Sequence, residues 1–115
     1  MLEKSTIVQV LRAAQKVGCE LVVNVAAPCG GATCVATSEQ IAGSIVGELH
    51  LPSSLVGLTP GEYADWVGLN GHVQCCSSTA SGRQCRNWAT GLPITDAKQW
   101  KAFRDTHPYC HVHGG

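Results

Sequence analysis

Apolar residues recur at helical spacing near the beginning of the chain. Their intervals of three and four residues predict an amphipathic helix over 6–17, because such positions share one helix face. Ser5 is a candidate N-cap for this helix, and Gly18 follows it at a position where helices commonly end. The apolar positions are Ile7, Val10, Leu11, Ala14 and Val17.

The next apolar pattern is a continuous run. Residues 21–27 are mainly valine, leucine and alanine, and Pro28 and the Gly30-Gly31 pair end the run. An apolar run of this length with several β-branched residues predicts a buried strand. We expect residues 29–34, with two glycines and two cysteines, to form a flexible loop.

Two segments carry strong helix-start signals. Thr37 and Gln40 have capping-box spacing, which predicts a helix that begins near Thr37. Thr59-Pro60-Gly61-Glu62 combines an N-cap threonine, an N1 proline and a glutamate three residues after the cap, which predicts a helix over 60–69. The side chains expected to point inward are Ile41, Ile45 and Val46 on the first helix and Tyr63, Trp66 and Val67 on the second.

Weaker signals predict two further elements. Leu49-His50-Leu51, just before Pro52, predicts a short strand. Thr95 predicts the cap of a helix over 96–105, which carries Trp100 and Phe103 one turn apart. The connection through Pro52 is longer than the turn of about four residues in a helix-turn-helix, so that DNA-binding motif is not expected.

Together these elements predict an α+β fold class, with a small core over 1–70 and a second unit over 71–115 that packs on it. The 115 residues are 44% apolar, which is enough for one buried core. No apolar stretch approaches the about 20 residues of a membrane helix, and the first residues lack the order of a signal peptide. We therefore expect a cytoplasmic protein without membrane association.

The chain contains seven cysteines. An odd number does not fit a fully paired disulfide framework, and a cytoplasmic location favours metal binding. The main candidates are spaced as Cys75-x9-Cys85-x24-Cys110-x2-His113. Three thiolates and one imidazole are a donor set that Zn²⁺ takes in closed, tetrahedral structural sites.

Local spacing supports this zinc site and leaves two alternatives open. Cys110 and His113 are close enough for one turn to direct both at a single ion, and Gly82 allows the chain to fold back between the first two cysteines. On spacing alone, Cys76 can replace Cys75, and His111 can replace His113.

This segment resembles a zinc-binding module of phage, prophage and bacterial proteins of uncharacterised role. That module has a cysteine, nine residues with threonine and glycine, Cys-Arg or Cys-Lys, and then Tyr-Cys-x-x-His-Gly-Gly. The spacer before the third cysteine is longer here than in the family, and the resemblance covers only about residues 75–115. It implies zinc binding and favours Cys75 over Cys76. The matching residues are Cys75, Thr79, Gly82, Cys85-Arg86, Tyr109-Cys110, His113 and Gly114-Gly115.

The remaining cysteines allow a second zinc site, a disulfide or free thiols. Cys19, Cys29 and Cys34 supply three ligands, and Cys76 or His50 could complete them.

A cysteine-dependent enzyme would pair Cys29 or Cys34 with His50 or His72. No third residue that would orient such a pair is apparent, so we expect a protein without enzymatic activity.

Charge separates the two halves of the neutral chain. Residues 1–74 have three basic and six acidic side chains, whereas residues 75–115 have five basic and two acidic ones. The basic residues form a candidate contact surface, with Trp88 or Trp100 for base stacking. They are Arg83, Arg86, Lys98, Lys101 and Arg104.

The zero net charge favours a protein partner over nucleic acid, which is the alternative. The sequence therefore predicts a zinc-stabilised protein that binds another protein, and the resemblance implies a phage or prophage origin. The resemblance implies that it inhibits or redirects a host machine.

Overall fold

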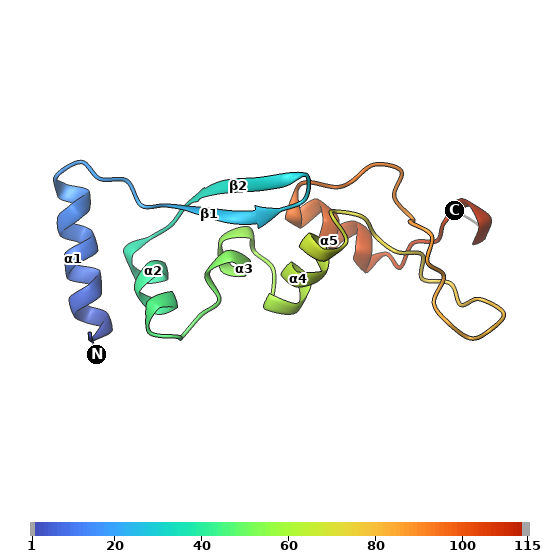
Figure 1. The fold of residues 1–115 in the computed structure, drawn as a ribbon, viewed down its shortest axis with the longest axis horizontal. Coiled ribbons are helices and arrows are strands. Elements are labelled where there is room, and N and C mark those ends of the chain that lie inside the picture. Colours follow the sequence, from blue (N-terminus) through green and yellow to red (C-terminus); the bar gives the residue numbers. More distant parts are fainter. Residues whose placement is uncertain (1, 114–115) are drawn as a thin grey trace.

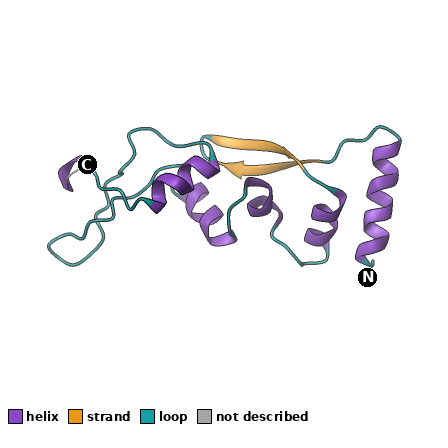
Figure 2. Cartoon of the chain, turned by 180° about the vertical axis from the view of Figure 1, so that it is seen from behind, coloured by secondary structure: helices purple, strands orange, loops and turns teal. Residues whose placement is uncertain are grey.

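The computed structural model describes residues 2–113, except for the side chain of His111. The predicted α+β fold class is confirmed, and Figures 1 and 2 show the helices and one two-stranded ribbon along an elongated body of 59 × 26 × 19 Å. In chain order the elements are α1 (Lys4–Lys16), β1 (Val22–Ala27), β2 (Gly30–Val35), α2 (Ser38–Ile45), α3 (Leu51–Val56), α4 (Pro60–Gly68), α5 (Ala97–Asp105) and the 3-10 helix η1 (His111–His113).

Helix α1 lies at one end of the molecule and packs on α2 (Figure 1). It begins earlier than predicted, with Glu3 and not Ser5 at the N-cap. Ile7 is its one buried residue within the described chain. Ion pairs from Arg12 to Glu39 and from Lys4 to Glu48 hold it against α2 and the turn that follows.

Strands β1 and β2 form an antiparallel hairpin, in which Val22 pairs with Val35 and Ala27 with Gly30. The expectation of a flexible loop over 29–34 is wrong. The turn that joins the strands is short, and Cys29 adopts a left-handed conformation there, with φ of 63°. Its backbone N–H donates to Asn70 Oδ1 at 2.8 Å, which ties the hairpin turn to the end of α4.

The capping signals position α2 and α4 as predicted. Thr37 and Thr59 each accept a hydrogen bond from the backbone N–H three residues ahead, and Gln40 and Glu62 complete the two capping boxes. The expectation that Ile45 points inward is wrong, because its side chain is exposed.

The strand predicted at 49–51 is also wrong, since Leu51 begins helix α3. His50 caps this helix through its Nδ1 atom, and Pro52 occupies the first turn, where no N–H is needed for the helix.

The main hydrophobic cluster joins α4 to α5. Trp100 is fully buried, and its Nε1–H donates to the carbonyl of His72 at 3.0 Å. Asp96 and not Thr95 caps α5, because its carboxylate accepts from the N–H of Gln99. The buried members are Leu58, Tyr63, Trp66, Val73, Ala97 and Trp100. This cluster draws on both sides of residue 70, so α5 packs on the domain that holds α4.

None of the helices in residues 2–113 combines the length and the apolar character needed to cross a bilayer.

Candidate metal centre

An irregular hairpin over residues 74–88 brings two of the cysteines face to face. The N–H of Cys75 donates to the carbonyl of Asn87, and the N–H of Cys85 donates to that of Ser77, both at 2.8 Å. The chain reverses near Gly82, whose φ of +82° favours glycine and whose N–H donates to Thr79. This pairing sets Cys75 and Cys85 on opposite arms.

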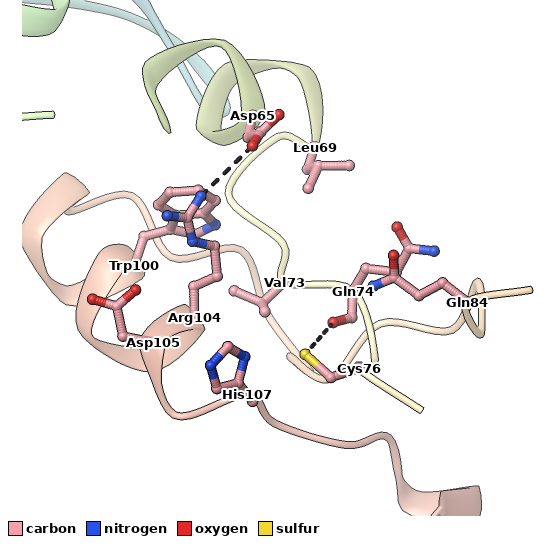
Figure 3. Close-up of a pocket in the computed structure, with 10 residues that line it drawn as sticks. All are labelled: Asp65, Leu69, Val73, Gln74, Cys76, Gln84, Trp100, Arg104, Asp105 and His107. Carbon is pink, nitrogen blue, oxygen red and sulfur yellow. Dashed lines mark hydrogen bonds and ion pairs between the residues drawn. The ribbon is translucent and has the colours of Figure 1, made fainter. Parts of the chain in front are cut away.

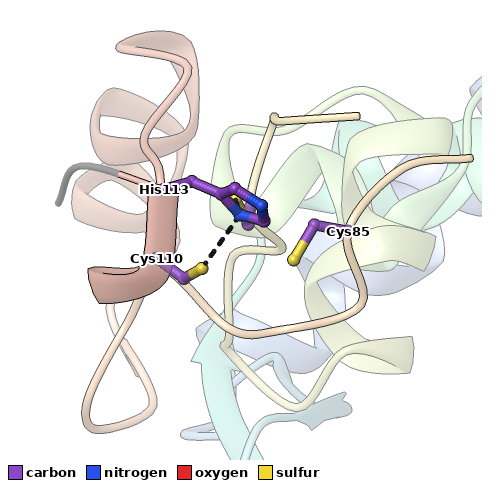
Figure 4. A group of neighbouring side chains, drawn as sticks. Cys85, Cys110 and His113 are labelled. Carbon is purple, nitrogen blue, oxygen red and sulfur yellow. Dashed lines mark hydrogen bonds between the residues drawn. The ribbon is translucent and has the colours of Figure 1, made fainter. Parts of the chain in front are cut away.

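The C-terminal segment supplies the other two side chains. The N–H of Cys76 donates to the carbonyl of Pro108 at 3.0 Å, which places the segment beside the hairpin. The turn of η1 is closed by a 3.0 Å hydrogen bond from the N–H of His113 to the carbonyl of Cys110. Both side chains therefore point toward the hairpin, and Figure 4 shows them converging with Cys85.

The geometry of the four side chains fits one tetrahedral ion. The ligand atoms of Cys75, Cys85, Cys110 and His113 all lie within 4.8 Å of one another. His113 Nδ1 is 3.5 Å from the Sγ atom of Cys75 and 3.3 Å from that of Cys110. Ordinary zinc bond lengths at tetrahedral angles place a sulfur and a nitrogen ligand about 3.6 Å apart. The three cysteines are buried, so these donors surround a position shielded from water.

Hydrogen-bond donors converge on the sulfur atoms. Burial disfavours the thiolate of Cys110, but hydrogen bonds from the Asn87 side chain and from the N–H groups of His113 and Val112 outweigh burial and lower its pKa to about 6. For Cys75, burial is likewise outweighed by backbone N–H groups, including that of Ser77 at 3.5 Å, and the pKa is lowered. Such donors support thiolate ligands.

The close packing of the four side chains raises the pKa of the other two candidate ligands, Cys85 and His113. The N–H of Asn87 favours the thiolate of Cys85, yet burial and the neighbouring sulfurs of Cys110 and Cys75 raise its pKa. Hydrogen bonds to Cys75 and Cys110 raise the pKa of His113. A divalent cation would relieve both effects, because it neutralises most of the charge of three thiolates and takes the Nδ1 lone pair.

Of the two alternatives that the sequence left open, the structure bears on the choice between Cys75 and Cys76. Cys75 belongs to the group, whereas the Sγ atom of Cys76 contacts the carbonyl of Gln74 at 4.0 Å and faces a cleft. The side chain of His111 and the Gly114-Gly115 pair lie outside the described part of the chain. Asn87 was missed by sequence analysis, because its side-chain N–H donates to the Sγ atom of Cys110 at 3.6 Å, and no local spacing indicates a contact between residues so far apart in the sequence.

The described residues contain no second group of three or more clustered metal ligands. Cys19, Cys29 and Cys34 are free thiols at the N-terminal end and on the ribbon, which does not support the second zinc site.

The histidines considered for a cysteine nucleophile have other partners. His50 Nδ1 lies 2.9 Å from the hydroxyl of Ser53, and His72 Nδ1 lies 2.9 Å from that of Thr90.

The cleft beside Cys76 has a volume of about 520 Å³ and separates the hairpin from α4 and α5 (Figure 3). Arg104 crosses its wall, with its guanidinium 4.8 Å from the centre of the Trp100 ring and 3.6 Å from an Asp65 carboxylate oxygen. Its polar rim also includes Asp105 and His107. Charges of both signs line this cleft, so it does not select a ligand by net charge.

The five basic residues of the predicted contact surface lie on two elements, three of them on α5 and two on the hairpin. Lys101 and Arg104 form ion pairs with Glu62 at 3.1 Å, and Lys98 lies beside Gly57. Arg83 and Arg86 remain exposed on the hairpin.

The expectation that Trp100 could stack on a base is wrong, because the ring is fully buried. Trp88 is 44% exposed and stacks on His72, with 4.9 Å between ring centres.

Comparison with models of protein families, with curated proteins and with solved structures finds no match to this chain.

Proposed function

We propose that the chain is a zinc-stabilised binding protein without enzymatic activity. The observation that carries this proposal is the closed donor set. Three sulfurs and one imidazole nitrogen fill all four positions of a tetrahedral ion, and catalytic zinc sites keep one position for water or substrate. Zn²⁺ bound here would supply folding energy to a segment in which the described residues 74–96 contain no helix.

The exposed side chains of the C-terminal part favour a protein partner. Leu92 is 82% exposed and Val112 65% exposed, and the aromatic rings of Trp88 and Tyr109 are half exposed. Aromatic side chains are enriched in the centres of protein interfaces, where they contribute much of the binding energy. A zinc-tied scaffold would hold such residues in place before binding and reduce the entropy lost on association.

The resemblance to phage and prophage zinc modules supports a phage-derived, cytoplasmic protein. Small proteins of that kind inhibit or redirect a host machine, and we propose this role for the exposed surface.

One observation favours nucleic acid as a second candidate partner. Arg83 and Arg86 line a shallow hollow of about 540 Å³ beside His113, together with the hydroxyl groups of Thr79 and Ser81. Such donors suit phosphate oxygens. Affinity that falls steeply with salt concentration would favour nucleic acid, whereas a weak dependence on salt favours protein.

The metal proposal is tested on tag-free protein by elemental mass spectrometry combined with thiol titration. We expect about one zinc per chain, and about three further thiols to react after chelation. Absence of zinc together with few reactive thiols after unfolding would contradict the proposal, because it would mean disulfides.

The binding proposal is tested with the double variant Leu92→Ser/Val112→Ser. These side chains are exposed, so zinc content and melting temperature should match those of the wild type while partner binding is lost. Arg83→Ala/Arg86→Ala is the matched variant for the nucleic-acid candidate. If only the arginine variant loses binding, the protein-partner proposal is wrong.

A further inference from the structure

The outer edge of β2 is an unpaired strand edge in the middle of the molecule. The N–H of Ala36 donates to the carbonyl of Leu21 at 2.9 Å, so these two residues form a hydrogen-bonded pair in register with the ribbon. Hydrogen-bonded and non-hydrogen-bonded pairs alternate in an antiparallel ladder. The N–H and C=O groups of Gly31, Thr33 and Val35 therefore point away from β1.

The opposite edge of the ribbon is covered. By the same alternation, the carbonyl of Ala26 points outward from β1, and it accepts a 2.6 Å hydrogen bond from the hydroxyl of Tyr63. Helix α4 contacts β1, and Figure 1 shows α3 and α4 on the β1 side of the ribbon. Within residues 2–113, the backbone N–H groups of Gly31, Thr33 and Val35 donate to no group outside the ribbon.

The β2 edge also lacks the features that keep strand edges from pairing. Proteins usually place lysine, proline or a bulge on an exposed edge. Here no charged residue stands between Glu20 and Glu39, the register is continuous, and Pro28 lies in the turn. The side chain of Val35 is 81% exposed, and its cross-strand neighbour Val22 is exposed beside it. The sheet has only two strands in the described part of the chain, and a further strand would add backbone hydrogen bonds to its open edge.

We propose that β2 pairs antiparallel with β2 of a second copy of this chain, which creates a four-stranded sheet across a two-fold axis. An antiparallel edge is self-complementary under such an axis, and the chain carries no net charge that would oppose the association of two copies. The outward groups set the register, with Thr33 opposite Thr33 and Gly31 opposite Val35, and provide about six backbone hydrogen bonds. The small Gly31 leaves room for the exposed Val35, and threonine pairs are favourable across strands.

The test is the molar mass of the zinc-loaded, full-length protein in a concentration series, measured by sedimentation velocity with a phosphine reductant to exclude disulfide-linked dimers. We expect the wild type to shift from monomer to dimer as concentration rises into the millimolar range. Thr33→Pro removes an outward N–H and leaves the β1–β2 ladder intact, so it should remain a monomer. Thr33→Lys is a second disrupting variant with ordinary strand geometry, because it places like charges opposite each other.

Thr33→Val is the matched control, since it keeps the backbone donor and the β-branched shape while it removes the hydrogen bond to Asn24. It should dimerise like the wild type. A wild type that stays monomeric, or a Thr33→Lys variant that dimerises as strongly as the wild type, would overturn the proposal. Dimers that persist in all variants would assign self-association to another surface.

Discussion

At the scale of single residues, the contacts of His113 are central to the C-terminal third. Its Nδ1 atom lies within 3.5 Å of the sulfurs of both Cys75 and Cys110. Such a contact joins the hairpin to η1, which are far apart in sequence. Neutral imidazole and thiol groups would gain little from this arrangement, because sulfur is a weak hydrogen-bond partner. Coordination of a shared cation would stabilise the convergence of all four side chains.

Adjacent cysteines provide a matched pair of variants for the metal centre. Cys75→Ser removes a proposed ligand, and we expect zinc content to fall from about one per chain to near zero, with loss of a contribution on the order of 10 kcal/mol to folding of the C-terminal part. Elemental analysis and thermal unfolding measure both effects.

Cys76→Ser is the control, because the Sγ atom of Cys76 lies outside the ligand group. It should keep wild-type zinc content and melting temperature. If Cys76→Ser loses zinc and Cys75→Ser retains it, the ligand assignment is reversed.

Residue types and spacing predicted that Cys85, Cys110, one cysteine of the 75–76 pair and a histidine near the C-terminus would meet, since Zn²⁺ sites of this kind use sulfur and imidazole ligands. Spacing could not separate Cys75 from Cys76, because neighbours on an irregular strand reach similar positions. The resolving feature is the pairing of Cys75 with Asn87 across the hairpin, which fixes the side-chain direction. Long-range pairing of that kind leaves no periodic signal in the sequence.

At the scale of elements, α4 connects the helical part to the metal-binding part. Its N3 residue, Glu62, accepts from the N–H of Thr59 and forms ion pairs with Lys101 and Arg104 of α5. The hydrogen bond from the backbone of Thr59 and the contact with Lys101 outweigh desolvation and hold the pKa of Glu62 below its ordinary value. One side chain therefore caps α4 and joins it to α5.

Glu62→Gln removes the charge and keeps the capping geometry, because glutamine also completes a capping box. The lowered pKa of Glu62 means that its charge stabilises the fold above the ordinary value of 4.5, and that this contribution is lost as pH falls through the lowered pKa. We expect the variant to melt below the wild type at neutral pH and the difference to close in acid. A difference that grows on acidification would contradict this account.

Gly71 lies in the connection between the end of α4 and the start of the hairpin, where it is closely packed. A Cβ atom there would lie 2.7 Å from the carbonyl oxygen of Ile94, at a φ of +80°. Gly57 shares this φ, but the nearest atom to a Cβ there is 3.6 Å away, on the flexible Lys98 side chain. We expect Gly57→Ala to lose about 1–2 kcal/mol of unfolding free energy from backbone conformation alone. Gly71→Ala should lose about 1–3 kcal/mol more through the clash.

Chemical denaturation of the two alanine variants measures both losses. Equal destabilisation would mean that Ile94 moves away freely and that the close approach at Gly71 has no structural role.

Elements with local stop and start signals were predictable, and elements that depend on distant partners were not. The capping boxes at Thr37 and Thr59 lie within one turn of chain, so the sequence contains them completely. Strand β2 was missed because its glycines and small residues have low strand propensity, and its ladder with β1 overrides that preference. Helix α3 was not predicted, and Leu51 at its start was assigned to a short strand, because Pro52 in the first turn of α3 also resembles a strand terminator.

At the scale of the whole molecule, two regions are joined through one hydrophobic cluster. The radius of gyration is 18.5 Å, whereas a compact chain of this length has about 13 Å. Helix α1 and the metal centre lie at opposite ends of this elongated body (Figure 1). Trp100 of the α4–α5 cluster donates to the carbonyl of His72, just before the hairpin, and the His72 ring stacks on Trp88 of the hairpin.

Removal of the metal by a chelator should therefore destabilise the metal-binding end of the molecule more than the α1 end. We expect hydrogen–deuterium exchange to accelerate most over 74–88 and 107–113, less over α5, and little over α1 and α2, whose contacts do not involve the metal ligands. Exchange measured by mass spectrometry before and after chelation tests this order. Uniform acceleration along the chain would mean that the metal centre and α1 unfold as one cooperative unit.

We propose a closed zinc site of three sulfurs and one nitrogen. Zinc K-edge X-ray absorption on tag-free protein tests it most directly, because it reports the ligand atoms and their distances. We expect three sulfur atoms at about 2.3 Å and one nitrogen at about 2.0 Å. A shell with fewer sulfurs and a water oxygen, or protein purified without zinc, would contradict it.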